Sequence, residues 1–176
     1  MLCPSHSRSA SDTGACPTRG FGVSLEIPFA GPAATGGARV PFAHTIGARL
    51  LDGAGFTGAR VGCAPEALAS VLAEQRGSVG ILAMGDGSAR RTLKAPGYLD
   101  EAAEPFDRAV AIALENGDAA ALAGLDPAAG ERLLAAGTTT WRAVGAALDG
   151  RRVAARLHYD DAPFGVGYLV ADWTTA

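Results

Sequence analysis

Apolar and polar residues alternate from Phe21 to Phe29, so one face of this segment is apolar. A period of two is typical of a β-strand with one buried face. Pro28 has no backbone N–H to donate, so we expect the strand to end there or to lie at a sheet edge. The preceding residues, 1–20, are rich in Ser, Thr, Gly and Pro. They predict a disordered or poorly ordered N-terminal segment.

Two helices are predicted in the next part of the chain. The first carries an apolar stripe at intervals of four and stops near Gly53. This stripe consists of Phe42, Ile46 and Leu50. The second helix begins at Pro65, which is tolerated at a first helical position, and ends near Gly77.

Two strands are predicted beside these helices. One is residues 60–63, and the other is residues 78–84, which read SVGILAM. A short, nearly continuous apolar run is typical of a strand that helices cover on both faces. We therefore expect residues 78–84 to form the central strand of a sheet.

The second half of the chain predicts three helices followed by two strands. Asp100, Asp126 and Thr140 are candidate N-caps of the helices. The helices are expected at 100–116, 126–137 and 141–148, and the strands at 152–159 and 165–173. Helices interleaved with strands predict a layered α/β fold.

Composition limits the classes of protein to which the chain can belong. With 176 residues and 48% hydrophobic content, it is expected to form one domain around one core. The net charge is −3 and the arginines are scattered, so nucleic acid is not an expected partner. No apolar run approaches the ~20 residues of a membrane span, and the start lacks the apolar stretch of a signal peptide. We therefore expect a cytoplasmic protein that does not enter membranes.

Several motifs favour structural interpretations. The three cysteines, Cys3, Cys16 and Cys63, show no spacing typical of a disulfide framework or a zinc site. Residues 53–58 match the dinucleotide pattern G-x-G-x-x-G. The pattern follows a predicted helix and precedes a strand, the reverse of a dinucleotide site, so it predicts a turn.

The loop Gly85-Asp86-Gly87-Ser88 follows the predicted central strand. Open α/β sheets bind ligands at the carboxyl ends of their strands, so this loop is a candidate site. A tight structural turn is the alternative. The loop is not the nucleophile elbow G-x-S-x-G of a serine hydrolase, because Ser88 falls three residues after Gly85 and is followed by Ala89.

No two of the three histidines, His6, His44 and His158, have a metal-ligand spacing, so a metal site would have to be assembled by the fold. His158 lies beside Asp160 and Asp161 and forms with them a cluster of imidazole and carboxylate groups. A solvated turn between two strands is the alternative interpretation of this cluster.

Residues 85–107, GDGSARRTLKAPGYLDEAAEPFD, resemble a stretch of the LigB-like class III extradiol ring-cleavage dioxygenases. That stretch reads roughly G-D-L-S-H-R-L, then A-P-x-G-Y-D, then a helix with F-D. Residues 117–127 and the ending YDDAPFGVGYLVADW resemble the terminal segment of the family, most closely in an actinobacterial branch. The resemblance covers roughly 40–176. It implies a three-layer α/β/α sandwich with a mixed sheet over 21–176, incomplete at its N-terminal side.

The resemblance also implies a chemistry. In the family, Fe(II) is held by two histidines and a carboxylate, binds a catecholic substrate and O₂, and opens the aromatic ring. For this chain it implies Fe(II) and a small aromatic molecule as ligands. Asp161 is the candidate metal ligand, Gly85, Gly87 and His158 are candidates for substrate binding, and Asp86 and Ser88 are the catalytic candidates.

The chain departs from the family at Ala89, which stands where the family has a histidine that acts as acid and base. The two metal histidines of the family lie in an N-terminal strand and a later loop, and this chain is expected to begin after most of that region. Cys3-Pro4-Ser5-His6 resembles the family's early C-P-H-P, but the residues around it do not match. Three hypotheses stay open: a divergent ring-cleaving enzyme, a non-catalytic domain that binds a small molecule or a protein, and a fragment or mis-started form of a longer protein. A missing leading strand would expose a sheet edge, which favours a homodimer.

Overall fold

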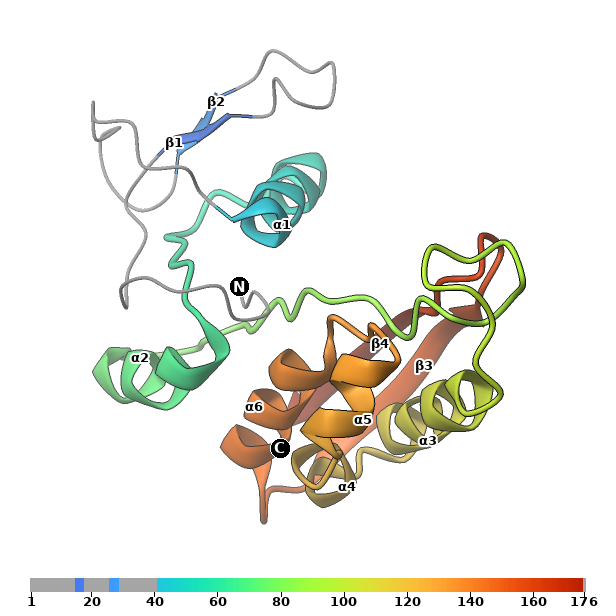
Figure 1. Ribbon diagram of the computed structural model, residues 1–176. Helices are drawn as coiled ribbons and strands as arrows, with labels where there is room; N and C mark the ends of the chain where they lie inside the picture. Colours follow the sequence, from blue (N-terminus) through green and yellow to red (C-terminus); the bar gives the residue numbers. More distant parts are fainter. Residues whose placement is uncertain (1–14, 18–25, 29–40, 176) are drawn as a thin grey trace. The chain divides into compact units, whose positions relative to one another are not determined.

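The structure of the chain is a computed structural model that describes residues 15–17, 26–28 and 41–175. The chain divides into two units, residues 1–84 and 85–176 (Figure 1), whereas its composition predicts one domain. The boundary falls directly before the predicted loop at 85–88. None of the helices in the described ranges is long and apolar enough to cross a membrane.

The first unit combines one small sheet with two helices. Strands β1 (Ala15–Pro17) and β2 (Glu26–Pro28) pair in antiparallel fashion. Helix α1 spans Phe42–Gly53, and a 3₁₀ turn at Pro65–Ala67 leads into α2 (Leu68–Glu74). Strand β2 ends at Pro28, as the sequence predicts, and the rest of the predicted strand 21–29 lies outside the described residues. Of the segment predicted to be disordered, only residues 15–17 are described.

Helix α1 is confirmed, but its apolar stripe does not form its buried face. Phe42 and Leu50 are 56% and 54% exposed. The buried side chains come from a neighbouring face that is mostly small: His44, Thr45, Gly47 and Ala48. Gly62 approaches this face so closely that a Cβ on it would lie 3.0 Å from Nδ1 of His44. The glycine at position 62 permits this close approach to the His44 ring, because any larger residue would place a Cβ against it.

The predictions of strands at 60–63 and 78–84 are wrong for the described residues. Only Gly62, Cys63 and Ala83 form isolated bridges, and neither segment belongs to a sheet. A strand requires a neighbour for its backbone hydrogen bonds, and the apolar run at 78–84 has no such ladder in the described part of the chain. The apolar pattern therefore identified an extended segment but not its pairing.

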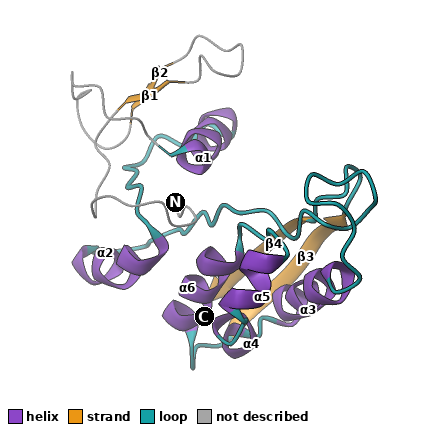
Figure 2. Ribbon diagram, in the orientation of Figure 1, coloured by secondary structure: helices purple, strands orange, loops and turns teal. Residues whose placement is uncertain are grey.

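The second unit contains helices on one side of a β-hairpin (Figure 2). Strands β3 and β4 pair in antiparallel fashion, from Val153 opposite Thr175 to Asp161 opposite Tyr168. A bulge between Leu157 and Tyr159 shifts the register. The elements are α3 (Ala103–Asn116), α4 (Ala119–Ala123), α5 (Pro127–Arg132), α6 (Thr138–Leu148), β3 (Val153–Asp161) and β4 (Tyr168–Thr175).

The core of the second unit lies between the helices and the hairpin. Side chains of α3, α4 and α6 meet there, and β4 contributes Leu169 and Trp173. Trp173 also donates from Nε1 to the carbonyl of Leu114 at 2.7 Å, which satisfies its one polar group. The buried members of this cluster are Val110, Ala113, Leu122 and Trp141. The described residues thus confirm a mixed α/β fold, with two two-stranded antiparallel sheets.

Residues next to the helix ends determine where several of the helices begin and end. Gly117 ends α3 with φ 66°, the left-handed conformation that glycine adopts easily. Asp118 and Asp126 accept backbone hydrogen bonds as the N-caps of α4 and α5. The predicted cap at Thr140 is wrong, because α6 begins at Thr138 and Thr140 is fully buried. The predicted helix 126–137 stops early, at Arg132, and Leu134 has φ 55°, which is not helical.

A close contact between α4 and α6 depends on Gly145. A Cβ at this position would lie 2.5 Å from the carbonyl oxygen of Ala119 and 2.5 Å from the backbone nitrogen of Ala123. Both atoms belong to the backbone, so neither can move aside without displacing α4. A glycine in mid-helix is therefore used here to bring two helices together.

We predict that Gly145→Ala destabilises the second unit. Helix propensity alone favours alanine by roughly 1 kcal/mol, whereas overpacking costs about 1–3 kcal/mol. The free energy of unfolding in urea, followed by the fluorescence of Trp141 and Trp173, measures the balance. Ala146→Gly, at an exposed position of α6, is the control for propensity. A more stable Gly145→Ala protein would contradict the close contact.

Candidate functional site

A buried carboxylate lies at the centre of the second unit. Asp107, on α3, is 1% exposed. Its Oδ1 accepts from the backbone N–H of Ser88 at 2.8 Å, and its Oδ2 accepts from Oγ of Ser88 at 2.7 Å and from Nη1 of Arg91 at 3.2 Å. A buried carboxylate is tolerated only when such donors replace its hydration. We call Ser88, Arg91 and Asp107 the Asp107 network.

The loop that carries Ser88 is also bonded to the turn between β3 and β4. Gly87 donates to the carbonyl of Gly167 at 2.7 Å, Gly167 donates to that of Ser88 at 2.8 Å, and Arg91 donates to that of Gly165 at 3.0 Å. A Cβ on Gly167 would lie 2.4 Å from Oδ2 of Asp107. Glycine is therefore required where this turn passes the buried carboxylate.

Three of the predicted site residues of the loop 85–88 have structural roles, and the fourth, Asp86, is exposed. Ser88 is fully buried, and its hydroxyl is engaged by Asp107. Gly87 bonds the turn, and Gly85 packs so closely on Gly137 that a Cβ would lie 2.4 Å from the Gly137 Cα. The structure therefore gives Gly85, Gly87 and Ser88 positions that hold the loop in place.

Asp86 lies on the exposed side of the same loop. Its backbone carbonyl accepts from the N–H of Gly137 at 2.8 Å. Partial withdrawal of the carboxyl group from water raises the pKa of Asp86 above 3.8, although the residue as a whole stays exposed. Of the two candidates for catalysis, Asp86 and Ser88, only Asp86 faces solvent.

His158 and Asp161 lie on β3, and their hydrogen bonds in the described part of the chain go to the hairpin itself. His158 pairs with the carboxylate of Asp172 on β4. Asp161 accepts from the backbone N–H of Ala162 at 2.7 Å and from the hydroxyl of Tyr159 at 3.5 Å. Partial burial and the adjacent Asp161 carboxylate raise the pKa of Tyr159. No hydrogen bond joins the predicted metal ligand to the loop 85–88.

Sequence reasoning missed the roles of Asp107, Arg91 and Gly167. One signal was available for Asp107, because it falls on the face of α3 that also carries Ala103 and Val110. A lone carboxylate at helical spacing within an apolar stripe predicts a buried, bonded group. Nothing comparable marks Arg91 or Gly167, since their partners are distant in the sequence.

The paired loops form a hollow of about 630 Å³, which we call the loop hollow. It is lined by Thr92, Leu93, Lys94, Pro163 and Phe164. Phe164 is 76% exposed and Leu93 is 60% exposed. Gly165, with φ 75°, allows the two walls to approach closely, because a Cβ there would lie 2.5 Å from Oγ1 of Thr92.

The loop hollow combines apolar side chains with one cation. Lys94 is the only lysine of the chain. None of the ion pairs found in the described part of the chain involves it. An aromatic ring and a proline ring beside an ammonium group and a hydroxyl can bind an aromatic anion.

Within the described ranges, no three His, Cys, Asp or Glu side chains are grouped so that they could hold a metal ion. Cys3 and His6 lie outside these ranges. Comparison with known proteins shows that no family model matches the chain. No curated protein matches it either. The LigB-like resemblance therefore stays a prediction.

We predict that Asp107→Ala lowers the free energy of unfolding by about 3 kcal/mol, because it leaves an arginine and a buried hydroxyl without their acceptor. Both tryptophans of the chain, Trp141 and Trp173, belong to this unit, so their fluorescence in urea reports its unfolding. Glu104→Gln, which removes the exposed pair with Arg108, is the control and is expected to cost less than about 0.5 kcal/mol. Equal effects of the two substitutions would argue against a central role of the network.

Proposed function

We propose that the chain is a LigB-like domain that binds a small aromatic anion in the loop hollow and does not cleave its ring. The observation that carries this proposal is the combination of Phe164, Pro163 and Leu93 with Lys94 around one hollow. The apolar side chains would pack on the ring of the ligand. Lys94 would offset its charge, and Thr92 would offer a hydroxyl as a hydrogen-bond donor.

The Asp107 network supports the proposal by holding the walls of the loop hollow. Arg91 precedes Thr92 directly, and its side chain is bonded to Asp107 while its N–H is bonded to Gly165. A hollow whose walls are already fixed loses little conformational entropy when a ligand binds. A bound ligand would also remove the exposed apolar surface of Phe164 and Leu93 from water, which favours binding.

Two residues favour binding over catalysis. Ala89 carries no group that transfers protons, at the position where the family has its acid–base histidine. Ser88 is fully buried and donates its hydroxyl to Asp107, so it is not available to a ligand. The loop 85–88 would therefore support the binding site and not perform chemistry.

We also propose that the β3–β4 hairpin belongs to a three-layer α/β/α sandwich with a mixed sheet, as the resemblance implies. The side of the hairpin away from the helices carries exposed side chains, among them Val170 at 55% and Arg156. A further layer on this side would cover them. A homodimer is one way to supply it.

Binding is tested by isothermal titration calorimetry with benzoate as the probe. We predict one site per chain and about tenfold weaker binding in Lys94→Gln, since a hydrogen bond to a charged group contributes roughly 1.5–3 kcal/mol. We expect a similar loss in Phe164→Ala, because this substitution removes apolar surface that would be buried against the ligand. Arg152→Gln, an exposed cation outside the loop hollow, is the control. Absence of benzoate binding, or equal binding by the Lys94→Gln protein, would contradict the proposal.

The second candidate function is Fe(II)-dependent ring cleavage, which the resemblance of residues 85–107 favours. In the described part of the chain, His158 and Asp161 supply one imidazole and one carboxylate, fewer than the two histidines and one carboxylate of the family. These residues alone do not fit a facial iron site.

Iron loading distinguishes the two functions. After anaerobic incubation with Fe(II) and removal of the excess, we predict that the purified chain and its Asp161→Ala variant contain no stoichiometric iron. Metal analysis provides the measurement. One iron per chain, lost in the variant, would support ring cleavage and overturn the non-catalytic proposal.

A further inference from the structure

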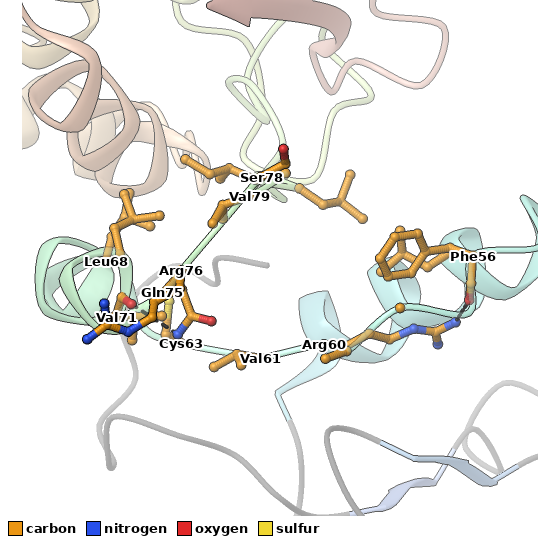
Figure 3. Close-up of a pocket in the computed structure, with 17 residues that line it drawn as sticks. Phe56, Arg60, Val61, Cys63, Leu68, Val71, Gln75, Arg76, Ser78 and Val79 are labelled. Carbon is orange, nitrogen blue, oxygen red and sulfur yellow. Dashed lines mark hydrogen bonds between the residues drawn. The ribbon is translucent and has the colours of Figure 1, made fainter.

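A second hollow lies within the first unit (Figure 3). It is bounded by the end of α1, the loop that follows, α2 and residues 78–82. Its volume is about 560 Å³, within the range of small-molecule sites, roughly 300–1,000 Å³. We call it the apolar hollow. All its lining residues belong to the first unit, so it is separate from the loop hollow.

Aliphatic side chains from two neighbouring segments of the chain line the apolar hollow. Helix α2 supplies Leu68, Val71 and Leu72, and the extended segment 78–82 supplies Ile81 and Leu82. This segment is the apolar run that the sequence predicts as a central strand. Without sheet neighbours in the described residues, it presents its apolar side chains to the hollow instead. A ligand with an aliphatic body would remove this surface from water.

The charged residues of the lining are all basic. The lining includes Arg60 and Arg76 and no Asp or Glu. Arg60 is already engaged, with Asp52 at 2.7 Å and with the carbonyl of Phe56 at 2.6 Å. Arg76 is exposed and belongs to none of the ion pairs found in the described part of the chain. The hydroxyl of Ser78, two residues later, belongs to the same lining.

We propose that the apolar hollow binds a medium-chain fatty carboxylate. The aliphatic chain lies against Leu68, Val71 and Leu72, and the carboxylate is bound by the guanidinium of Arg76. Charge complementarity selects this class, because a lining with an unpaired cation and no acidic group favours an anion over a neutral lipid.

The proposal is tested by isothermal titration calorimetry of the full chain with decanoate and, separately, with decanol, both kept below the concentrations at which they aggregate. We expect one decanoate per chain and about tenfold weaker binding of decanol, because only decanoate forms a charge-assisted hydrogen bond with Arg76. Absence of decanoate binding, or equal binding of the two probes, would overturn the proposal.

Substitutions locate the site. We expect Arg76→Gln to weaken decanoate binding about tenfold and to leave decanol unchanged. Arg49→Gln, an exposed cation of the same unit outside the lining, and Lys94→Gln, in the loop hollow, should bind decanoate as the unmodified chain does. A loss in Lys94→Gln without a loss in Arg76→Gln would overturn the assignment, because decanoate would then occupy the loop hollow.

Discussion

The second unit depends on how the carboxylate of Asp107 is kept in its interior. A buried carboxylate loses its hydration and must be bonded on both oxygens. Here the donors come from Ser88 and Arg91, which are 19 and 16 residues earlier in the chain. The need to satisfy one charge therefore fixes the path of a long loop. The turn between β3 and β4 is held by the same requirement, because Gly167 lies directly on the carboxylate.

This arrangement connects stability with the proposed binding function. Residues 85–91 are positioned by Asp107, and residues 92–94, which continue the same loop, form one wall of the loop hollow. The other wall consists of Pro163 and Phe164. Its position is fixed by the hydrogen bonds between this loop and Gly165 and Gly167. A buried polar network of this kind contributes specificity of conformation as well as stability. It leaves Phe164 and Leu93 exposed beside Lys94, in an arrangement suited to an aromatic anion.

Local chemistry in the sequence predicts the second unit better than the first. The cap at Asp126 and the two final strands depend on near neighbours in the sequence, so patterns within a few residues identify them. Residues 78–84 show the limit of such patterns: their apolar run predicts a central strand, but pairing depends on partners elsewhere in the chain. The Asp107 network also depends on residues that are distant in the sequence, since no local pattern relates Arg91 or Gly167 to the carboxylate. Asp86 and His158 could be predicted to lie in a loop and in a strand. The sequence predicts Asp161 in the turn after residue 159, but it lies at the end of β3.

Amide hydrogen exchange of the second unit tests the central claim most directly, because it reports the stability of individual backbone hydrogen bonds. If the Asp107 network fixes the loop, the amides of Gly87, Ser88 and Gly167 exchange as slowly as those of Val110 and Ala113 in the core of α3. Exchange of these three amides at the rate of the exposed Leu93 amide would contradict the account, because the loop would then open independently of the core.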